Sequence, residues 1–324
     1  MIPEDCHTIG NLDLMNAASF DFPEGLTSGR FNVQGTSHDV VVQKPLKSKI
    51  LKWTTKGGRL DFEHGVVCSR ASLNSGTGAL SCNGLKSNRA RLITTGGGLT
   101  VTGDVCVRTD AYMSSAYGAL AVGNIQGGSL VFDTSGGPVA IGDVDAQHFE
   151  VSSGFASSDV GQIGSKTAKL TTSGGALDVA GLFVDSAQTS TAFGATTIGP
   201  SSVSSAKIET TGGPVHCEAL NDIHTLEIAS AFGKVNANMD FPESGSIKTT
   251  GGAINARFFG DSGGTLAINS AFGAVDAVFE SKDPVHPDPS EAFGGRLDIT
   301  AGFGKVRIAG EDHGNKFKGT VGDQ

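Results

Sequence analysis

The stretches Ile208-Glu-Thr-Thr-Gly-Gly-Pro-Val-His-Cys217 and Ile228-Ala-Ser-Ala-Phe-Gly-Lys-Val-Asn-Ala237 decide the fold. In each stretch an apolar/polar alternation leads into a glycine-containing corner, and a second alternation follows. Period-2 alternation on both sides of a corner indicates two β-strands, each with one buried face. The corners differ, because one has Gly-Gly where the other has Phe-Gly.

The same unit recurs along the chain at a nearly constant period. A Ser or Thr, here called the anchor, stands two residues before the corner position that varies. The anchors are Thr55, Ser75, Thr94, Ser115, Thr134, Ser153, Thr172, Thr191, Thr210, Ser230, Thr249 and Ser270. Neighbouring anchors are therefore about 20 residues apart, a spacing within the range of known repeat architectures. Ala301 extends the series after an insertion, and two weaker units precede it near Asn16 and Gly35.

The length of the unit predicts the fold class. A coil of about 19–21 residues, with two clear strands and room for a third short one, is typical of a single-stranded parallel β-solenoid, or β-helix. We predict an all-β protein of about 15 coils, stacked about 4.8 Å apart over roughly 70 Å. Leucine-rich repeats would need a helical arm, and a β-sandwich would not keep its loops in fixed register.

The solenoid is expected to occupy most of the chain. Residues 1–50 read as an N-terminal cap with the first irregular coils, and residues 51–310 as the regular solenoid. A Pro-rich insertion at 280–293 reads as an exposed loop, and residues 311–324 as a C-terminal tail or cap. Such caps are expected because open solenoid ends expose unpaired strand edges.

The corner explains why the repeat is a pair of coils. Two positions after the anchor the residues are Gly57, Thr77, Gly96, Tyr117, Gly136, Phe155, Gly174, Phe193, Gly212, Phe232, Gly251 and Phe272. Strand parity predicts that these side chains point into the coil, where close packing would favour a glycine above and below each ring. Gly-Gly and Phe-Gly corners therefore alternate in a double-coil repeat of about 39 residues.

Two further corner positions carry packing expectations. The anchor hydroxyls are expected to form an internal column whose hydrogen bonds are satisfied within the protein. Three positions after the anchor, twelve of thirteen units have glycine, with Ala156 as the exception. This recurrence predicts either a turn with positive φ or tight stacking of neighbouring coils.

From Thr95 to Ala271, the position directly after the anchor points outward and is small and uncharged. Its members include Thr95, Ser135, Ser173, Thr211, Ala231, Thr250 and Ala271. A flat, uncharged sheet face invites docking, either by a protein partner or by a second copy of the chain. The alternative is that small residues merely accompany a tight corner. An ice-binding array is disfavoured because no Thr-x-Thr motif repeats here.

Candidate chemistry is sparse. The outward position six after the anchor holds Asp159, Asp178 and His216, with Thr197 between the last two. Neighbouring carboxylates could raise one pKa or bind a cation, as in a carbohydrate-active β-helix, but no Arg or Lys completes the cluster. A solvated strand face is the simpler interpretation. In the insertion, His286 and Asp288 are too few ligands for a metal site. We expect no catalytic constellation, cofactor or metal.

Composition narrows the partners and the compartment. The chain has 324 residues and a net charge of -9. It has no apolar run near the roughly 18 residues of a membrane helix. The charge argues against nucleic acid and anionic membranes. Five scattered cysteines (Cys6, Cys68, Cys82, Cys106 and Cys217) predict reduced thiols in an intracellular compartment. No signal peptide is visible at the start, although a targeting segment removed upstream is compatible with the sequence.

The recurring Thr-Thr-Gly-Gly-x-Val and Ser-Ala-Phe-Gly-x-Val units resemble the adhesin-like family of β-helical domains of unknown function. That family has bacterial and eukaryotic members, and the resemblance covers roughly residues 50–310. It implies a soluble protein similar to the eukaryotic members, some of which look mitochondrial. It implies no catalytic residue. We therefore expect a non-catalytic scaffold or protein-interaction module, with a carbohydrate-binding or carbohydrate-cleaving β-helix as the alternative.

Overall fold

The computed structural model describes residues 8–15, 27–35, 37–260, 264–280 and 296–310. Contacts between residues divide the chain into two compact units, Met1–Ser165 and Lys166–Gln324, which are described separately here. The predicted cap around residue 20, the insertion at 281–293 and the tail at 311–324 lie outside the described residues. Within the described ranges no helix is present, so none is long and apolar enough to cross a membrane.

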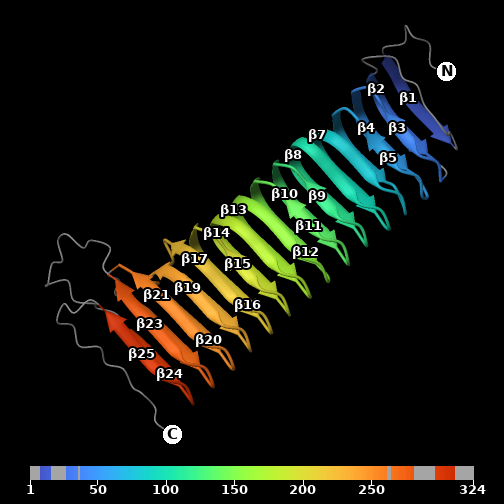
Figure 1. Cartoon of the computed structure of the whole chain (residues 1–324). Coiled ribbons are helices and arrows are strands. Elements are labelled where there is room, and N and C mark those ends of the chain that lie inside the picture. The colour runs from blue at the N-terminus through green and yellow to red at the C-terminus, as the bar shows by residue number, and fades with distance from the viewer. Residues whose placement is uncertain (1–7, 16–26, 36, 261–263, 281–295, 311–324) are drawn as a thin grey trace. The chain divides into compact units, whose positions relative to one another are not determined.

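Both units are built from parallel strands (Figure 1). Unit 1 contains β1 (Thr8–Met15), β2 (Thr27–Gln34), β3 (Val40–Val42), β4 (Leu46–Thr54), β5 (Leu60–Phe62), β6 (Val66–Asn74), β7 (Leu80–Thr94), β8 (Leu99–Ser115), β9 (Leu120–Val122), β10 (Ile125–Thr134), β11 (Val139–Ile141) and β12 (Val144–Ser153). The next strand, β13 (Ser158–Thr172), runs across the boundary between the units.

Unit 2 contains β14 (Leu177–Thr191), β15 (Thr196–Ile198), β16 (Ser201–Thr210), β17 (Val215–Asn221), β18 (Thr225–Ser230), β19 (Val235–Asp240), β20 (Ser244–Thr249), β21 (Ile254–Phe259), β22 (Thr265–Ser270), β23 (Val275–Glu280), β24 (Arg296–Ala301) and β25 (Val306–Gly310). Pairing follows the sequence period, since Leu80 faces Leu99 in unit 1 and Ile208 faces Ile228 in unit 2. The prediction of a parallel β-solenoid is confirmed. The described coils make about 13 turns, slightly fewer than the 15 expected.

The coil that contains β7 has the third short strand for which the sequence left room. In β7, register shifts between Asn83 and Leu85 and between Ser87 and Arg89 divide one long strand into three segments. The first segment follows one corner, the last leads into the next corner, and the middle one connects them. The bends let a single strand turn around the core without losing its pairing to the next coil.

The core fills with the side chains that alternation assigns to it. In β4, Leu51 and Trp53 are completely buried while Lys52 between them is exposed. The ring of Phe31 stacks on Trp53 with centroids 5.7 Å apart, and the ring of Phe62 meets Trp53 edge-on at 5.6 Å. Full burial of such side chains contributes roughly 1.5–3 kcal/mol each, so the interior alone can specify the stack.

The anchor hydroxyls are buried and bond mainly within their own corners. Thr210 Oγ1 donates to the carbonyl of Gly213 at 2.9 Å, and Ser230 Oγ donates to that of Gly233 at 2.9 Å. The amides of both glycines donate back to the same hydroxyls at 3.0 and 2.9 Å. The expected internal hydrogen bonding is confirmed. It closes each corner on itself, because the hydroxyl and the third residue after it lie across a tight bend.

Tight stacking accounts for the glycine column three positions after the anchor. A Cβ added at Gly213 would lie 1.8 Å from the carbonyl oxygen of Gly194 in the neighbouring coil. Among described residues, the positive-φ glycines are Gly76, Gly84, Gly103 and Gly260, and none belongs to this column. Coil-to-coil approach of the backbone therefore leaves no room for a Cβ at Gly213, and left-handed backbone geometry is not the reason. Ala156 shows that one coil of the column does accept a methyl group.

Candidate docking surface

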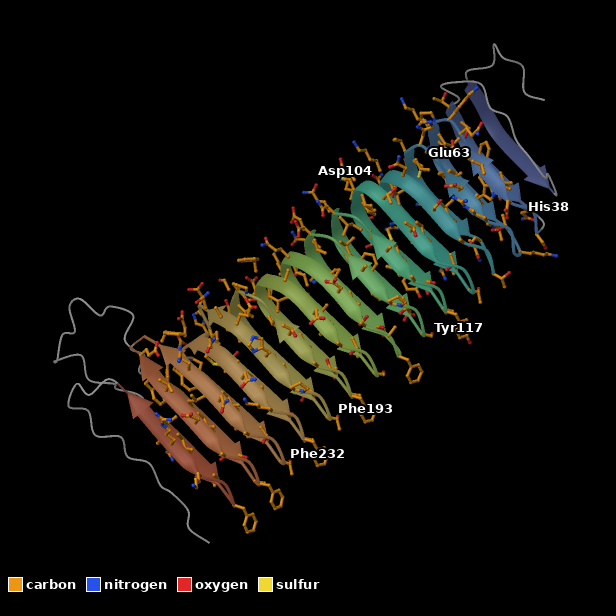
Figure 2. The ribbon with its side chains drawn as sticks, in the orientation of Figure 1. His38, Glu63, Asp104, Tyr117, Phe193 and Phe232 are labelled. Atoms are coloured by element: carbon orange, nitrogen blue, oxygen red, sulfur yellow. The ribbon has the colours of Figure 1, made fainter. Side chains whose placement is uncertain are left out.

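The aromatic corner residues do not point into the coil, which corrects the prediction from strand parity. Tyr117, Phe155, Phe193, Phe232, Phe272 and Phe303 expose between 62% and 80% of their surface. Figure 2 shows Tyr117, Phe193 and Phe232 projecting from the corner edge of the ribbon. Parity fails because each ring follows the anchor within a bend, where successive side chains no longer alternate between two faces.

The alternation with glycine still has a packing reason, but it lies on the surface. A Cβ added at Gly212 would lie 3.3 Å from Cδ1 of Phe193, and one at Gly251 would lie 3.2 Å from Cδ1 of Phe232. Each ring therefore leans over the glycine of the next coil. The result in unit 2 is a row of exposed rings on every second coil, roughly 9.6 Å apart, with a glycine between neighbours.

One pair of rings shows what the space between them accepts. Phe272 and Phe303 lie on neighbouring coils, because the alternation breaks after the insertion at 280–293. Their rings stack with centroids 5.3 Å apart and planes 4° from parallel. A flat ring therefore fits one coil away from another ring, in the position that glycine leaves open elsewhere in the row.

The small-residue column lies beside this row, as predicted. Thr211, Thr250 and Ala271 are exposed, Ala231 is partly buried, and Ser173 is exposed at the start of unit 2. Thr95 and Ser135 are exposed in unit 1. In unit 2 the column lines a shallow groove of about 830 Å³ that extends from Thr171 to Gly302.

The groove is nearly uncharged. Among the described residues that line it, only Glu209 and Lys248 carry charge, and they stand on the coils before and after Ala229. Next to the groove, Lys207 Nζ lies 2.9 Å from Glu209 Oε1 and 3.3 Å from Glu227 Oε2. The hydrogen bond to Glu209, and then that to Glu227, raises the pKa of Lys207 and keeps it cationic. This trio is net negative, whereas Lys248 supplies the positive charge.

The residues of the carboxylate column are divided between the two units. Asp159 lies in unit 1 opposite Ala140, whereas Asp178 lies in unit 2 opposite Thr197. Thr197 separates Asp178 from His216 by one full coil. All three candidate residues are exposed. His286 and Asp288 fall outside the described residues.

The remaining reactive groups have packing roles. Cys68, Cys82, Cys106 and Cys217 are free thiols, and burial raises the pKa of Cys68, Cys82 and Cys217 to about 12, so these three stay protonated. Across the described part of the chain, no three His, Cys, Asp or Glu side chains gather in a way that could hold a metal ion.

Comparison with known proteins finds no relative. No protein-family model matches the chain, and no curated protein and no solved structure is detectably similar to it. The resemblance to the adhesin-like family therefore stays a prediction, and the functional argument depends on the geometry of the surface.

Proposed function

We propose that the protein is a non-catalytic, adhesin-like interaction module that docks through the corner surface of unit 2. This surface, here called the ring face, comprises Phe193, Phe232, Phe272 and the groove beside them. The observation that supports this proposal is the exposure of the rings. Phe193 is 74% exposed, Phe232 69% and Phe272 62%, and they recur at a regular spacing of two coils. Contiguous exposed apolar side chains beside an uncharged groove are typical of protein interfaces.

The energetics favour an occupied ring face. An aromatic side chain buries about 150–250 Å² when fully covered. At about 25 cal/mol per Å², covering the exposed part of one ring yields roughly 2–4 kcal/mol. Three rings at a shared spacing supply the kind of aromatic anchors that dominate binding energy at interfaces. In the isolated chain this free energy is not realised.

The occupant that fits best is a second copy of the chain. A second copy has the same coil spacing, so its rings match the row along its whole length, whereas another partner would need that period independently. In an antiparallel pair the rings of the two copies lean in opposite directions and can pass beside one another. The Phe272–Phe303 stack shows that a ring is accepted there.

Charge agrees with a two-fold arrangement. With the axis at the coil of Ala229, Glu209 of each copy stands opposite Lys248 of the other, because both are one coil away from the axis. In an isologous interface every contact forms once on each side of the axis, so the interface contains two Glu209–Lys248 pairs. Elsewhere the groove offers no charge that would repel a second copy.

Sedimentation equilibrium of the full chain tests this proposal. The variant Phe193→Ser/Phe232→Ser/Phe272→Ser removes the ring row, and Phe183→Ser removes an exposed aromatic ring of unit 2 outside the row. We expect wild type and Phe183→Ser to dimerise equally, and the triple variant to dimerise roughly 100-fold more weakly. A wild type that stays monomeric at every concentration, or a triple variant with wild-type affinity, contradicts the second copy as occupant.

A further inference from the structure

The net charge of -9 conceals a basic segment. Residues 40–110 contain eleven Lys and Arg but only four Asp and Glu. Two of these acids are already paired, Asp61 with Arg59 at 2.5 Å and Asp110 with Arg89 at 3.2 Å. The other two, Glu63 and Asp104, lie along the edge of the ribbon opposite the corner edge that holds His38 (Figure 2). Within residues 40–110 the positive charge is therefore largely uncompensated.

Strand register stacks these cations in columns on both sides of the bend between Ser87 and Arg89. Arg70 pairs with Arg89, Lys52 stands in the same column as Arg91 with Ser72 between them, and Lys47 stands in the same column as Lys86 with Val67 between them. All of these basic side chains are exposed. Together with Arg108 they form what is here called the basic face: Lys47, Lys52, Arg70, Lys86, Arg89, Arg91 and Arg108.

This arrangement does not stabilise the fold. Arg70 and Arg89 are direct neighbours on adjacent strands, where like charges destabilise a sheet. Among the cations of the basic face, the described residues give an ion pair only to Arg89. Arg91 places its guanidinium 5.5 Å from the ring centroid of Tyr112. Exposed, repelling cations in register gain most from a ligand that brings several negative charges at once.

Three arginines line a groove on the basic face. Its volume is about 490 Å³, and Ser69, Arg70, Asn88, Arg89, Arg108 and Thr109 line it. It lies where the register shifts between Ser87 and Arg89 bend the strand. Thr109 Oγ1 donates to the carbonyl of Asn88 at 2.7 Å and fixes neighbouring coils at this bend. Arg70 and Arg89 stand in one column about 4.8 Å apart. Asp110, which pairs with Arg89, holds the next place in that column, and Arg108 lies two residues before it within the bend.

We propose that the basic face binds an acidic polysaccharide of the hexuronan class, with one carboxylate per sugar, lying along the coil stack. A sugar ring in an extended chain is about as long as one coil step, so the polymer can bring carboxylates to Arg70 and Arg89, which stand one coil apart, and to Arg108 at the bend beside them. Arginine recognises carboxylates through two parallel hydrogen bonds. Ser69, Asn88 and Thr109 supply the neutral polar groups that sugar hydroxyls need.

Nucleic acid fits the basic face less well. Non-specific binding of single strands uses aromatic platforms on which successive bases stack. Tyr112 is the aromatic ring in these columns, and Arg91 already lies over it. Phosphates in one strand of a duplex follow each other at about 3.4 Å along the axis, which does not match the coil spacing of about 4.8 Å. The site lies in unit 1 and is independent of the ring face in unit 2.

Titration calorimetry of the full chain tests the proposal with polygalacturonate as the probe. The triple variant Arg70→Gln/Arg89→Gln/Arg108→Gln removes the groove cations. A control variant, Arg257→Gln/Arg296→Gln/Arg307→Gln, makes the same charge change on exposed arginines of unit 2. We expect wild type and control to bind equally and the groove variant to bind at least roughly tenfold more weakly.

Comparison ligands separate the possible sources of negative charge. We expect a neutral glucan to leave no signal, and a single-stranded oligonucleotide and phosphatidylserine vesicles to bind more weakly than polygalacturonate. Tighter binding of the oligonucleotide or the vesicles overturns the hexuronan assignment. Absence of polygalacturonate binding, or equal loss in the groove and control variants, overturns the site itself. Neither result bears on dimerisation through the ring face, because the calorimetric variants leave the rings intact.

Discussion

The basic face of unit 1 and the ring face of unit 2 belong to the same repeat but present opposite chemistry. Both rest on the same inward pattern, with apolar residues in the arms, a buried hydroxyl at the anchor and glycine three positions later. Outward positions of the arms differ, since Arg70 and Arg89 are neighbours in unit 1. Rings such as Tyr117 and Phe193 project from corners in both units. The interior thus specifies the coil, and the outward columns are free to acquire different binding surfaces.

The largest expected loss of stability comes from substitution in the glycine column three positions after the anchor. Gly213→Ala places a Cβ 1.8 Å from a backbone oxygen, and backbone cannot move aside without breaking the stack. We expect a loss of more than about 3 kcal/mol in the free energy of unfolding, or no folded protein. Gly212→Ala next to it meets only a ring atom at 3.3 Å, so we expect less than about 1 kcal/mol. Urea unfolding followed by circular dichroism measures both, and equal losses would break the distinction between inward and outward positions.

A second comparison concerns the stability cost of replacing a buried and an exposed phenylalanine by alanine. Phe132 is completely buried, and Phe193 is 74% exposed. We expect Phe132→Ala to destabilise the fold by about 3–5 kcal/mol and Phe193→Ala by less than about 1 kcal/mol. The measurement is the shift in the urea midpoint at unchanged slope. If Phe193→Ala were the more costly change, its ring would be a structural element of the corner and the ring face would lose its main support.

The anchor hydroxyl should show a smaller effect of the same kind. Thr210 Oγ1 is buried and both donates to and accepts from Gly213, whereas Thr211 next to it is exposed. Removing the hydroxyl in Thr210→Val leaves buried backbone groups without their partner, and we expect a loss of about 1–3 kcal/mol. For Thr211→Val the expected change stays within about 0.5 kcal/mol. Thermal unfolding of the two variants side by side tests this, and indistinguishable midpoints would argue against the anchor's role.

A further effect appears only at alkaline pH. Burial raises the pKa of Cys217 from 9.0 to about 12, so the folded state keeps a proton that the unfolded state has lost. Stability should therefore fall as pH rises from about 9 towards 12, by up to about 1.4 kcal/mol per pH unit for this thiol. We expect Cys217→Val to flatten the fall measured by urea unfolding between about pH 8 and pH 11. Parallel curves for wild type and Cys217→Val would contradict the shift.

The sequence predicts the solenoid well because a period of about 20 residues with alternating arms leaves few other folds. It predicts the outward position of Thr211 and Thr250 for the same reason. The direction of Phe193 is mispredicted because the ring follows the anchor inside a bend, where strand parity does not apply. The basic face was missed because the net charge hides it, although Arg70, Arg89 and Arg108 recur at the coil period itself.

The central claim, that outward columns of this solenoid form binding surfaces, is tested most directly by charge reversal at the ring face. Glu209→Lys and Lys248→Glu each place like charges across the proposed two-fold, and combining them restores an opposite pair. Sedimentation equilibrium measures the dissociation constant of the dimer. We expect each single variant to weaken dimerisation by roughly tenfold and the double variant to recover wild-type affinity. A double variant as weak as the single variants, or single variants that dimerise like wild type, would contradict the antiparallel ring-face dimer.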